Sequence, residues 1–554
     1  MTNNIFSKKL YLQGLKRLRT VGIAATICII LLNVISPITQ IVDPSRYVKN
    51  ISQSQVAPYS ILGLIFAPIM VHYIFSYLNS RSQSDFYHAI PETRICVYVS
   101  FMSAVVSWIT AILLVSGTLN SLMWLIAPKC NLDIILAFKA TASYIAATLM
   151  MIGFMAFAMM LTGTTVSNII LFIVSSIFLR TVGGMFLACV KAASPVFLSS
   201  HSFLKYLSFD YFLPWSLLVD SFSSYASTSI LLILYSIIAG FALIAISGLL
   251  YKNRRSEIAG NSAPSKRLQS IYRYAITFPF ILFIAFSICS DGIESYQILL
   301  VALAFLVYTL FELITTKSIK SMVKAIPKIL IPTVAGVIFI IGVFITGHAI
   351  NNTTPQPNEI QSVAILSNEY HYITPSYEDL ATDKVSIEDS RITKIVSEAL
   401  EEYADTGTRD LKKDDFMKYA EVMITLDSGR KIWRSIMFTE SEIAKIDSYL
   451  MESKEYKLAF TSIPSESEVS SVRIYGEESL SHSQQKELWE CFYEEYNTLS
   501  ESDKIFIKNS EYGDYSNIPE IEVSGYKGIE SFSSSYVIFY HLMPRTCSLL
   551  RKMT

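Results

Sequence analysis

The chain has 554 residues, of which 52% are hydrophobic and only 16% charged, and its mean hydropathy is +0.41. This composition is too apolar for a soluble protein of that length and argues against a globular enzyme. Residues 1–350 carry 24 Lys and Arg against 10 Asp and Glu, a net charge of +14, whereas residues 351–554 carry 21 against 36, a net charge of −15. The sequence therefore predicts a membrane domain followed by an acidic soluble domain. No basic tract is interleaved with aromatic residues, so we expect no nucleic-acid partner.

Nine apolar stretches are long enough to cross a lipid bilayer, which takes about 20 residues per helix. They lie at about 20–38, 58–78, 95–118, 140–162, 166–190, 228–251, 272–290, 295–315 and 329–349. Ahead of them, residues 1–19 place five basic residues among leucines. This pattern predicts a cytoplasmic amphipathic N-terminal helix, or else a segment that only supplies positive charge for orientation.

The charges of the loops predict how these spans are oriented. With the N-terminus inside, the inner segments hold 16 Lys and Arg and the outer segments hold 6. Positive charge accumulates on the cytoplasmic side, so we expect a cytoplasmic N-terminus. Nine spans then place residues 351–554 outside the cytoplasm. The long outer segment 191–227, with Pro195, Pro214 and Trp215, predicts re-entrant or interfacial helices.

Residues 351–554 alternate helix and strand signals and predict one or two small α+β modules. A helix is expected over 392–403, and a hairpin joins 422–426 to 432–438 through a turn at 427–430. Capping boxes predict helix starts at Thr439, with Glu442, and at Ser481, with Gln484. Further strands are expected near 456–462, 470–475, 504–508 and 534–540. The predicted fold class is thus mainly α: a polytopic helical domain over 20–350 and an extracytoplasmic α+β domain over 351–554.

Motifs for catalysis are missing from the sequence. It contains no G-x-x-x-x-G-K-[ST], G-x-S-x-G, H-E-x-x-H or C-x-x-C, so no catalytic, cofactor-binding or metal-ligating residues are predicted. Any ATP used by this protein would bind, with Mg²⁺, to a partner chain. Cys491 and Cys547 could form a disulfide only if their domain lies outside the cell, and the sequence leaves that open.

The loop between the second and third spans, residues 79–94, carries the strongest functional signal. Ser84 is placed to cap a short helix that ends before Pro91. This helix would present aromatic and charged side chains together on the cytoplasmic face, which favours a protein-docking surface over an ordinary linker. These side chains are Asp85, Phe86, Tyr87 and His88.

Two stretches resemble a known family, SDFYHAIP over 84–91 and RSEIAG over 255–260. They are similar to bacterial ABC transporter permeases of the ABC-2 type, and more narrowly to the Firmicute group that ends in an extracytoplasmic domain. The stretch LDSGRKIWR over 426–434 extends the resemblance into the acidic domain. Two features depart from the usual pattern: the family core has six spans, and the large external domain is not general to the class.

The resemblance implies roles for particular residues. Asp85, Phe86, Tyr87, His88 and Pro91 would form the loop that docks on a separate ATPase subunit. Glu257 and Gly260 match a second cytoplasmic motif. The family also places short helices between its fifth and sixth spans, at the outer gate, in agreement with the expectation for 191–227.

Charged residues inside the predicted spans are few. Arg180 lies deep in the fifth span, and intramembrane charges are costly and usually functional. It could line a substrate path, pair within the bundle or extend towards the surface. Gly183 and Gly184 follow it and could break the helix at a gate.

The leading hypothesis is the permease subunit of an ATP-driven exporter in the bacterial cell membrane, itself not an enzyme. Its expected partners are cytoplasmic ATPase subunits, a second permease in a homo- or heterodimer, and the lipid bilayer. Export of a peptide or a lipophilic drug is the expectation from the family. One alternative is a sensor or scaffold whose external domain binds a ligand. An ion-coupled transporter is another, which Arg180 with Gly183 and Gly184 would support.

Overall fold

The computed structural model describes residues 4–42, 58–126, 134–194, 196–197, 230–292, 294–353, 355–366, 376–406, 417–474, 480, 482–510, 518–527 and 530–553. These residues form two compact units. The first is drawn from Met1–Cys189 and Phe203–Val343, and the second from Val190–Ser202 and Phe344–Thr554. The second unit therefore includes the residues that follow the fifth apolar stretch, besides the C-terminal domain.

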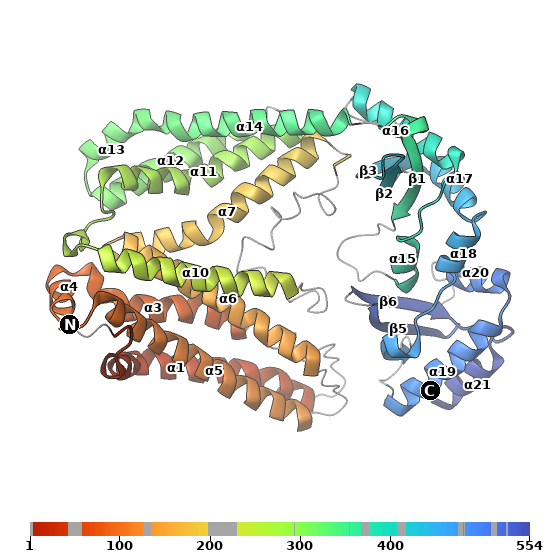
Figure 1. The fold of residues 1–554 in the computed structure, drawn as a ribbon, viewed down its shortest axis with the longest axis horizontal. Helices are drawn as coiled ribbons and strands as arrows, with labels where there is room; N and C mark the ends of the chain where they lie inside the picture. Colours follow the sequence, from red (N-terminus) through yellow and green to blue (C-terminus); the bar gives the residue numbers. More distant parts are fainter. Residues whose placement is uncertain are drawn as a thin grey trace. The chain divides into compact units, whose positions relative to one another are not determined.

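The first unit is entirely helical in the residues that the structure describes (Figure 1). Its longer elements are α1 (Lys8–Val42), α3 (Ala67–Phe75), α5 (Arg94–Ile126), α6 (Ile134–Leu161), α7 (Thr165–Ala193), α10 (Ile230–Asn253), α11 (Lys266–Asp291), α12 (Gln297–Thr316) and α14 (Leu330–Asn351). Its short elements are η1 (Leu62–Phe66), η2 (Ser76–Asn79), α4 (Arg81–His88), η6 (Ser256–Ile258), α13 (Ile319–Ala325) and η7 (Ile326–Ile329).

Nine helical segments among the described residues are long and apolar enough to cross a membrane, which confirms the expected lengths and composition. They are Lys8–Ile35, Pro58–Asn79, Arg94–Met123, Thr141–Leu161, Thr165–Ala193, Leu232–Asn253, Lys266–Ile288, Gln297–Thr316 and Ile319–Asn351. Each overlaps one predicted stretch. The second is assembled from η1, α3 and η2 rather than from one regular helix.

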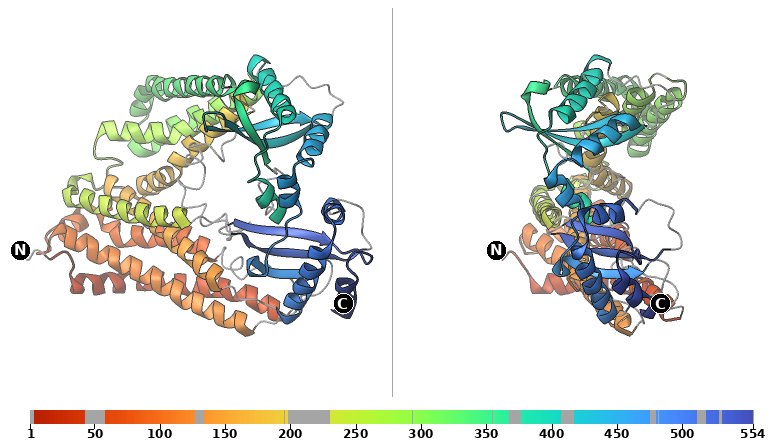
Figure 2. Two further views of the ribbon diagram at one scale, coloured as in Figure 1. Left: turned by 45° about the vertical axis from the view of Figure 1, so that its right-hand side comes forward. Right: turned by 90° about the vertical axis from the view of Figure 1, so that its right-hand side faces the viewer.

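Close helix packing organises the core of the first unit (Figure 2). Helix α1 packs along α5, and α6 packs along α10. A Cβ atom at Gly22 would lie only 2.5 Å from the ring of Trp108, and one at Gly153 would lie 2.7 Å from Leu243. Small residues at these crossings let the helix backbones approach one another, as is usual among apolar helices.

The N-terminal segment does not form a separate helix. Residues from Lys8 to Val42 are one continuous helix, α1, which measures about 52 Å at 1.5 Å per residue. Leu10 and Leu18 are buried, and the carbonyl of Leu15 accepts a hydrogen bond from Trp108 Nε1 at 3.2 Å. Residues 8–19 thus continue into the first apolar stretch as one helix with Leu10 and Leu18 packed inward, and the assignment of 1–19 as a cytoplasmic amphipathic helix stays a prediction.

Helix α7 also runs without interruption. Gly183 and Gly184 are buried within it and do not break it, so the predicted break is wrong. Both glycines therefore lie in regular helix, although glycine lowers helix propensity. The segment 191–227 lies mostly outside the described residues, including Pro195, Pro214 and Trp215, as does the cap residue Ser481.

The second unit contains two three-stranded antiparallel sheets, in the orders β1-β2-β3 and β4-β5-β6. The strands are β1 (Ile360–Leu366), β2 (Met417–Leu426), β3 (Lys431–Thr439), β4 (Val469–Ile474), β5 (Glu520–Lys527) and β6 (Glu530–Val537). The helices are η8 (Pro357–Glu359), α15 (Tyr377–Thr382), α16 (Ser390–Thr406), α17 (Glu440–Leu450), α18 (Lys454–Phe460), η9 (Glu466–Glu468), α19 (His482–Thr498), α20 (Glu501–Asn509) and α21 (Pro544–Met553).

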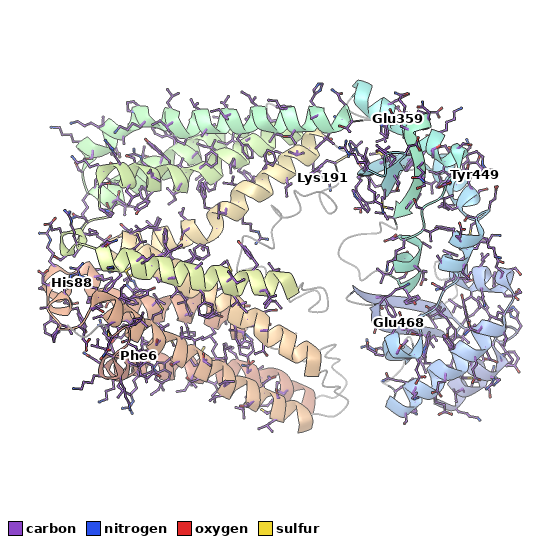
Figure 3. All side chains as sticks on the ribbon, in the orientation of Figure 1. Phe6, His88, Lys191, Glu359, Tyr449 and Glu468 are labelled. Carbon is purple, nitrogen blue, oxygen red and sulfur yellow. The ribbon has the colours of Figure 1, made fainter. Side chains whose placement is uncertain are left out.

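The two sheets belong to two copies of one module. Each copy opens with a 3₁₀ turn that carries a capping box ending in Glu359 or Glu468 (labelled in Figure 3). Each then has a strand with a register shift after its first residue, one or more helices, a two-stranded hairpin and a final helix. The opening segments are also similar in sequence, NEIQSVAI over 358–365 and SEVSSVRI over 467–474. The C-terminal domain is therefore a tandem repeat.

Helix α15 crosses from the first repeat into the second. It follows β1 in the chain, yet Tyr377 and Leu380 are buried in the second core, beside Trp489, Phe492 and Tyr536. Glu378 on α15 forms a buried ion pair of 2.9 Å with Lys508 on α20. Helix α15 is thus contributed by the chain of the first repeat to the core of the second repeat, and it joins the two repeats into a single body.

Several predictions for this domain are confirmed, and two are wrong. The hairpin at 422–438, the helix at 392–403, the strand at 470–475 and the capping box of Thr439 with Glu442 all occur. The strand expected at 534–540 is β6, which begins earlier. The strands expected at 456–462 and 504–508 are instead the short helices α18 and α20. Their N-termini are capped by Ser453 and Ser500, which accept backbone hydrogen bonds. Cys491 and Cys547 are both free thiols.

Candidate functional site

The helix predicted between the second and third spans is α4, at one end of the first unit (Figure 1). It begins at Arg81, with Ser80 as the N-cap residue in extended conformation. Ser84 is inside the helix and its hydroxyl is buried, so the prediction that Ser84 caps α4 is wrong. The helix ends at His88, and Ala89 closes its last turn by donating to the carbonyl of Asp85.

One face of α4 is open to the surroundings. The side chain of Phe86 is 66% exposed, and Asp85 and Pro91 are also exposed. The rings of Phe86 and Tyr87 meet edge to face at 5.5 Å. The exposed face of α4 therefore places a large apolar ring beside a carboxylate.

Tyr87 is the contact that holds α4 against the longer helices. Its ring stacks on Tyr77 with a centroid separation of 4.1 Å. Its hydroxyl accepts a 2.9 Å hydrogen bond from Arg17 Nη1, while Nη2 of the same guanidinium donates to Ser76 Oγ at 3.1 Å. Arg17 also lies 5.8 Å from the ring centres of Tyr73, Tyr77 and Tyr87, within cation–π range. Four elements, α1, α3, η2 and α4, meet at this one guanidinium.

His88 is half-buried at the end of α4 (labelled in Figure 3). Its ring lies 6.1 Å from that of Tyr251, whose hydroxyl shares a buried 2.8 Å hydrogen bond with Tyr77. Burial lowers the pKa of His88, and the positive charges of Arg94 and Arg254 lower it further, against a smaller opposing effect of Asp85. This environment therefore disfavours the protonated form of His88.

Arg254 fastens the ends of three elements together. It is 3% exposed, and its guanidinium donates to the carbonyls of Met159, Met160 and Leu78 at 2.9, 2.6 and 3.1 Å. Burial lowers its pKa to about 10, and the group remains charged at neutral pH. The acceptors are carbonyls near the ends of α6 and η2, where helices leave such groups without internal partners. Arg254 therefore supplies hydrogen bonds that these helix ends would otherwise lack.

The second predicted motif lies against the turn between α6 and α7. Gly260 N donates to the carbonyl of Gly163 at 2.8 Å, and Gly163 N donates to the carbonyl of Asn261 at 2.9 Å. Gly260 has a φ of +85°, a conformation that favours glycine. A Cβ atom at Gly163 would lie 1.9 Å from the carbonyl oxygen of Ile258, so this turn accepts only glycine without rearrangement. Glu257 is exposed, and its carbonyl accepts from Asn261.

The two motifs thus belong to one assembly, which we call the α4 junction: α4, the turn 162–164 and residues 254–261. Helix α4 contacts η6 directly, and Arg94, which follows the α4 loop, donates to the carbonyls of Lys252 and Arg254. Sequence reasoning identified seven residues in or beside this assembly: Asp85, Phe86, Tyr87, His88, Pro91, Glu257 and Gly260. It missed the residues that hold the assembly, which are Arg17, Tyr77, Gly163, Tyr251 and Arg254.

Arg180, Gly183 and Gly184 are not part of the α4 junction. Arg180 lies fifteen residues beyond the start of α7, about 22 Å along the helix from the turn 162–164. Near it, Thr181 and Met185 border an apolar cavity of about 370 Å³ that is completed by residues of α11 and α12. The structure therefore separates the predicted gate residues from the predicted docking loop.

The α4 junction presents an outward surface on a helix that is fixed from behind by packed side chains. Arg254 is engaged with backbone carbonyls and Arg17 with aromatic side chains, while Asp85 and Phe86 face outward from a helix braced on its other side. A rigid surface with one large apolar side chain beside a charge suits a protein partner, because little ordering entropy is lost on binding.

Comparison with known proteins gives no identification: no family model, no curated protein and no solved structure matches this chain. The geometry of the α4 junction is therefore the basis for the function proposed.

Proposed function

We propose that this chain is the membrane-spanning permease subunit of an ATP-driven exporter, and that a separate cytoplasmic ATPase subunit docks on α4. The observation that carries this proposal is the construction of α4, which exposes Phe86 and Asp85 while Tyr87 is locked by Arg17 and Tyr77. Nine membrane-length helices among the described residues and the positive charge of the loops at the α4 end support it.

Contacts of α4 and its loop connect it to three longer helices, α1, α5 and α10. Tyr87 contacts Arg17 of α1, His88 lies beside Tyr251 of α10, and Arg94 begins α5. A partner that moves α4 during ATP hydrolysis would therefore displace these three helices together. The proposed substrate is a peptide or a lipophilic molecule, moved through a dimer of such permeases.

The test is purification of the tagged chain from its native membranes in mild detergent, with identification of the proteins recovered with it. A stoichiometric soluble chain with a phosphate-binding loop is the expected result. Phe86→Ser should abolish its recovery, because the exposed ring is the anchor of the contact. Ile319→Ser, which removes a side chain 69% exposed on α13, is the matched control and should leave recovery unchanged.

Recovery of the intact chain without any nucleotide-binding protein, while a known tight complex survives the same detergent, would overturn the exporter. It would favour the sensor or scaffold, in which the C-terminal domain binds a ligand and signals through another chain.

A further inference from the structure

The first repeat of the C-terminal domain includes a segment of chain from far upstream. Val196 and Phe197, which follow α7, lie along the outer edge of β3. Ser435 N of β3 donates to the carbonyl of Val196 at 3.0 Å, and Phe197 bridges Arg434 in antiparallel fashion. Val196 is 1% exposed and belongs to the core of this repeat, together with Val363 and Ile436. The residues after α7 thus complete the sheet of the first repeat.

The end of α14 meets the same edge. Arg434 Nη2 donates to the carbonyls of Ile350 and Thr353, both at 3.2 Å, and Nη1 donates to its neighbour Trp433 at 3.0 Å. Burial, and then the nearby Arg430, lower the pKa of Arg434 to about 10. A buried cation is costly, but here it lies at the C-terminal end of a helix, where carbonyls are unpaired and the helix dipole is negative.

The ends of α7 and α14 also touch each other. Ser194 Oγ donates to Asn351 Oδ1 at 2.5 Å, and a Cβ atom at Gly347 would lie 3.1 Å from Cβ of Ala193. Three elements distant in sequence therefore converge within a few residues of Arg434. The second repeat uses the corresponding position differently: Tyr536 pairs with Ile521 as Arg434 pairs with Val422, and its ring is buried in that repeat's own core.

We infer that the first repeat is an anchor that fixes the end of α7 to the end of α14, so that the repeat and both helix ends move as one body. A ligand or partner that displaces this repeat would then displace the end of α7 as well. The coupling runs through the backbone pairing of Val196 with β3 and through the hydrogen bonds of Arg434 to the end of α14. For a transporter, this would connect the C-terminal domain to the helix that carries Arg180. The anchor itself does not depend on what the protein transports.

The test uses the full-length chain in lipid nanodiscs, with the native cysteines replaced and Ala193→Cys combined with Gly347→Cys. The Cβ separation of 3.1 Å is a few tenths of an ångström below the range of a disulfide, so a small adjustment brings the two sulfurs into bonding range and mild oxidation should cross-link most molecules. Adding Arg434→Met should slow cross-linking by about tenfold or more, because two charge-assisted hydrogen bonds are lost. Arg430→Met, at the exposed turn of the same hairpin, removes a nearby positive charge but none of these hydrogen bonds, so it is the matched control and should not slow cross-linking.

A second readout is independent of cysteine chemistry. Hydrogen exchange of the Ser435 amide should be slow in the parent and accelerate by about tenfold or more in Arg434→Met. The amide of Ile424 in the middle of β2 should stay protected in both and so report that the repeat is folded. Equal cross-linking rates and equal Ser435 exchange in the two arginine variants would overturn the anchor. Both readouts are blind to ATPase binding, so their failure is distinct from failure of the exporter.

Discussion

The guanidinium of Arg17 and the phenol of Tyr87 are joined by a 2.9 Å hydrogen bond across 70 positions of sequence. This bond links the first helix of the chain to the short helix α4. Because Tyr87 also stacks on Tyr77, the outward direction of Phe86 is determined by contacts that Phe86 itself does not make.

Removing the Tyr87 hydroxyl should separate these two contributions. Tyr87→Phe keeps the stack on Tyr77 and loses the bond from Arg17, so we expect a loss of about 1.5–3 kcal/mol, the value for a hydrogen bond to a charged donor. Tyr87→Ala loses both and should lower stability further. Phe86→Ala, which removes an exposed ring, should leave the free energy of unfolding nearly unchanged. Thermal unfolding of the detergent-solubilised chain measures all three, and equal losses for Tyr87→Phe and Phe86→Ala would contradict the assignment.

The α4 junction should depend on Arg254 far more than on its neighbour Arg255. Arg254→Met leaves the carbonyls of Leu78, Met159 and Met160 without this donor, and each unpaired buried group costs about 1–3 kcal/mol. Arg255 is exposed, and Arg255→Met should cost less than about 0.5 kcal/mol. Chemical denaturation of the two variants under one condition gives the comparison.

A glycine pair offers a sharper steric test. Gly163→Ala places a methyl group 1.9 Å from the carbonyl oxygen of Ile258, so the turn 162–164 must move and both of its backbone bonds to residues 260 and 261 weaken. We expect a clear fall in the melting temperature. Gly342→Ala in α14 meets no atom within 4 Å and should be neutral or stabilising by up to about 1 kcal/mol. A harmless Gly163→Ala would show that the turn is held differently.

Acid should loosen α4 through His88. The pKa of His88 is lower when α4 packs against the helix bundle than when α4 is detached from it, so the detached state binds the proton first. Packing of α4 on the bundle therefore weakens as the pH falls below the ordinary histidine pKa of about 6.5. Above that pH both states are neutral and the effect vanishes. The hydrogen-exchange rate of the amides of residues 81–90, corrected for intrinsic rates, should increase between pH 8 and pH 5. His88→Gln should remove it; persistence of the pH response in that variant would assign it to another group.

The exchange of α15 between the two repeats should make Lys508 critical. Lys508→Met strips the buried Glu378 of its partner, which typically costs about 3–5 kcal/mol. The double variant Glu378→Gln with Lys508→Met removes the unpaired charge and should recover part of this loss. Denaturation followed by the fluorescence of the buried Trp489 monitors this core. A double variant less stable than Lys508→Met alone would show that Glu378 does more than balance charge.

The apolar helices could be predicted because a bilayer demands length and hydropathy, and both are visible in sequence. The β2–β3 hairpin could also be predicted from sequence, because the glycine in its turn marks a position that needs a positive φ. Gly429 has a φ of +77° in the structure. The helices α18 and α20 were mistaken for strands because helices of seven to nine residues show too little periodicity to outweigh their β-branched and aromatic residues.

The α4 junction was only half predictable, for a different reason. Phe86 and His88 could be singled out because aromatic side chains are unusual in a short polar loop. Arg254 could not, because its hydrogen-bond acceptors are main-chain carbonyls. Every residue has a carbonyl, so sequence cannot mark the ones that will be used. The same is true of Gly163, whose partner is the backbone of residues 260 and 261.

The two repeats use one matched position of their sheets for different purposes. Arg434 pairs with Val422 in the first repeat as Tyr536 pairs with Ile521 in the second, yet Arg434 binds the end of α14 while Tyr536 is buried in its own repeat's core. If one module was duplicated, chains descended from a single-copy ancestor would carry one module directly after the last apolar helix. Their edge-strand residue at this position would reveal whether attachment to the helices preceded the duplication or followed it.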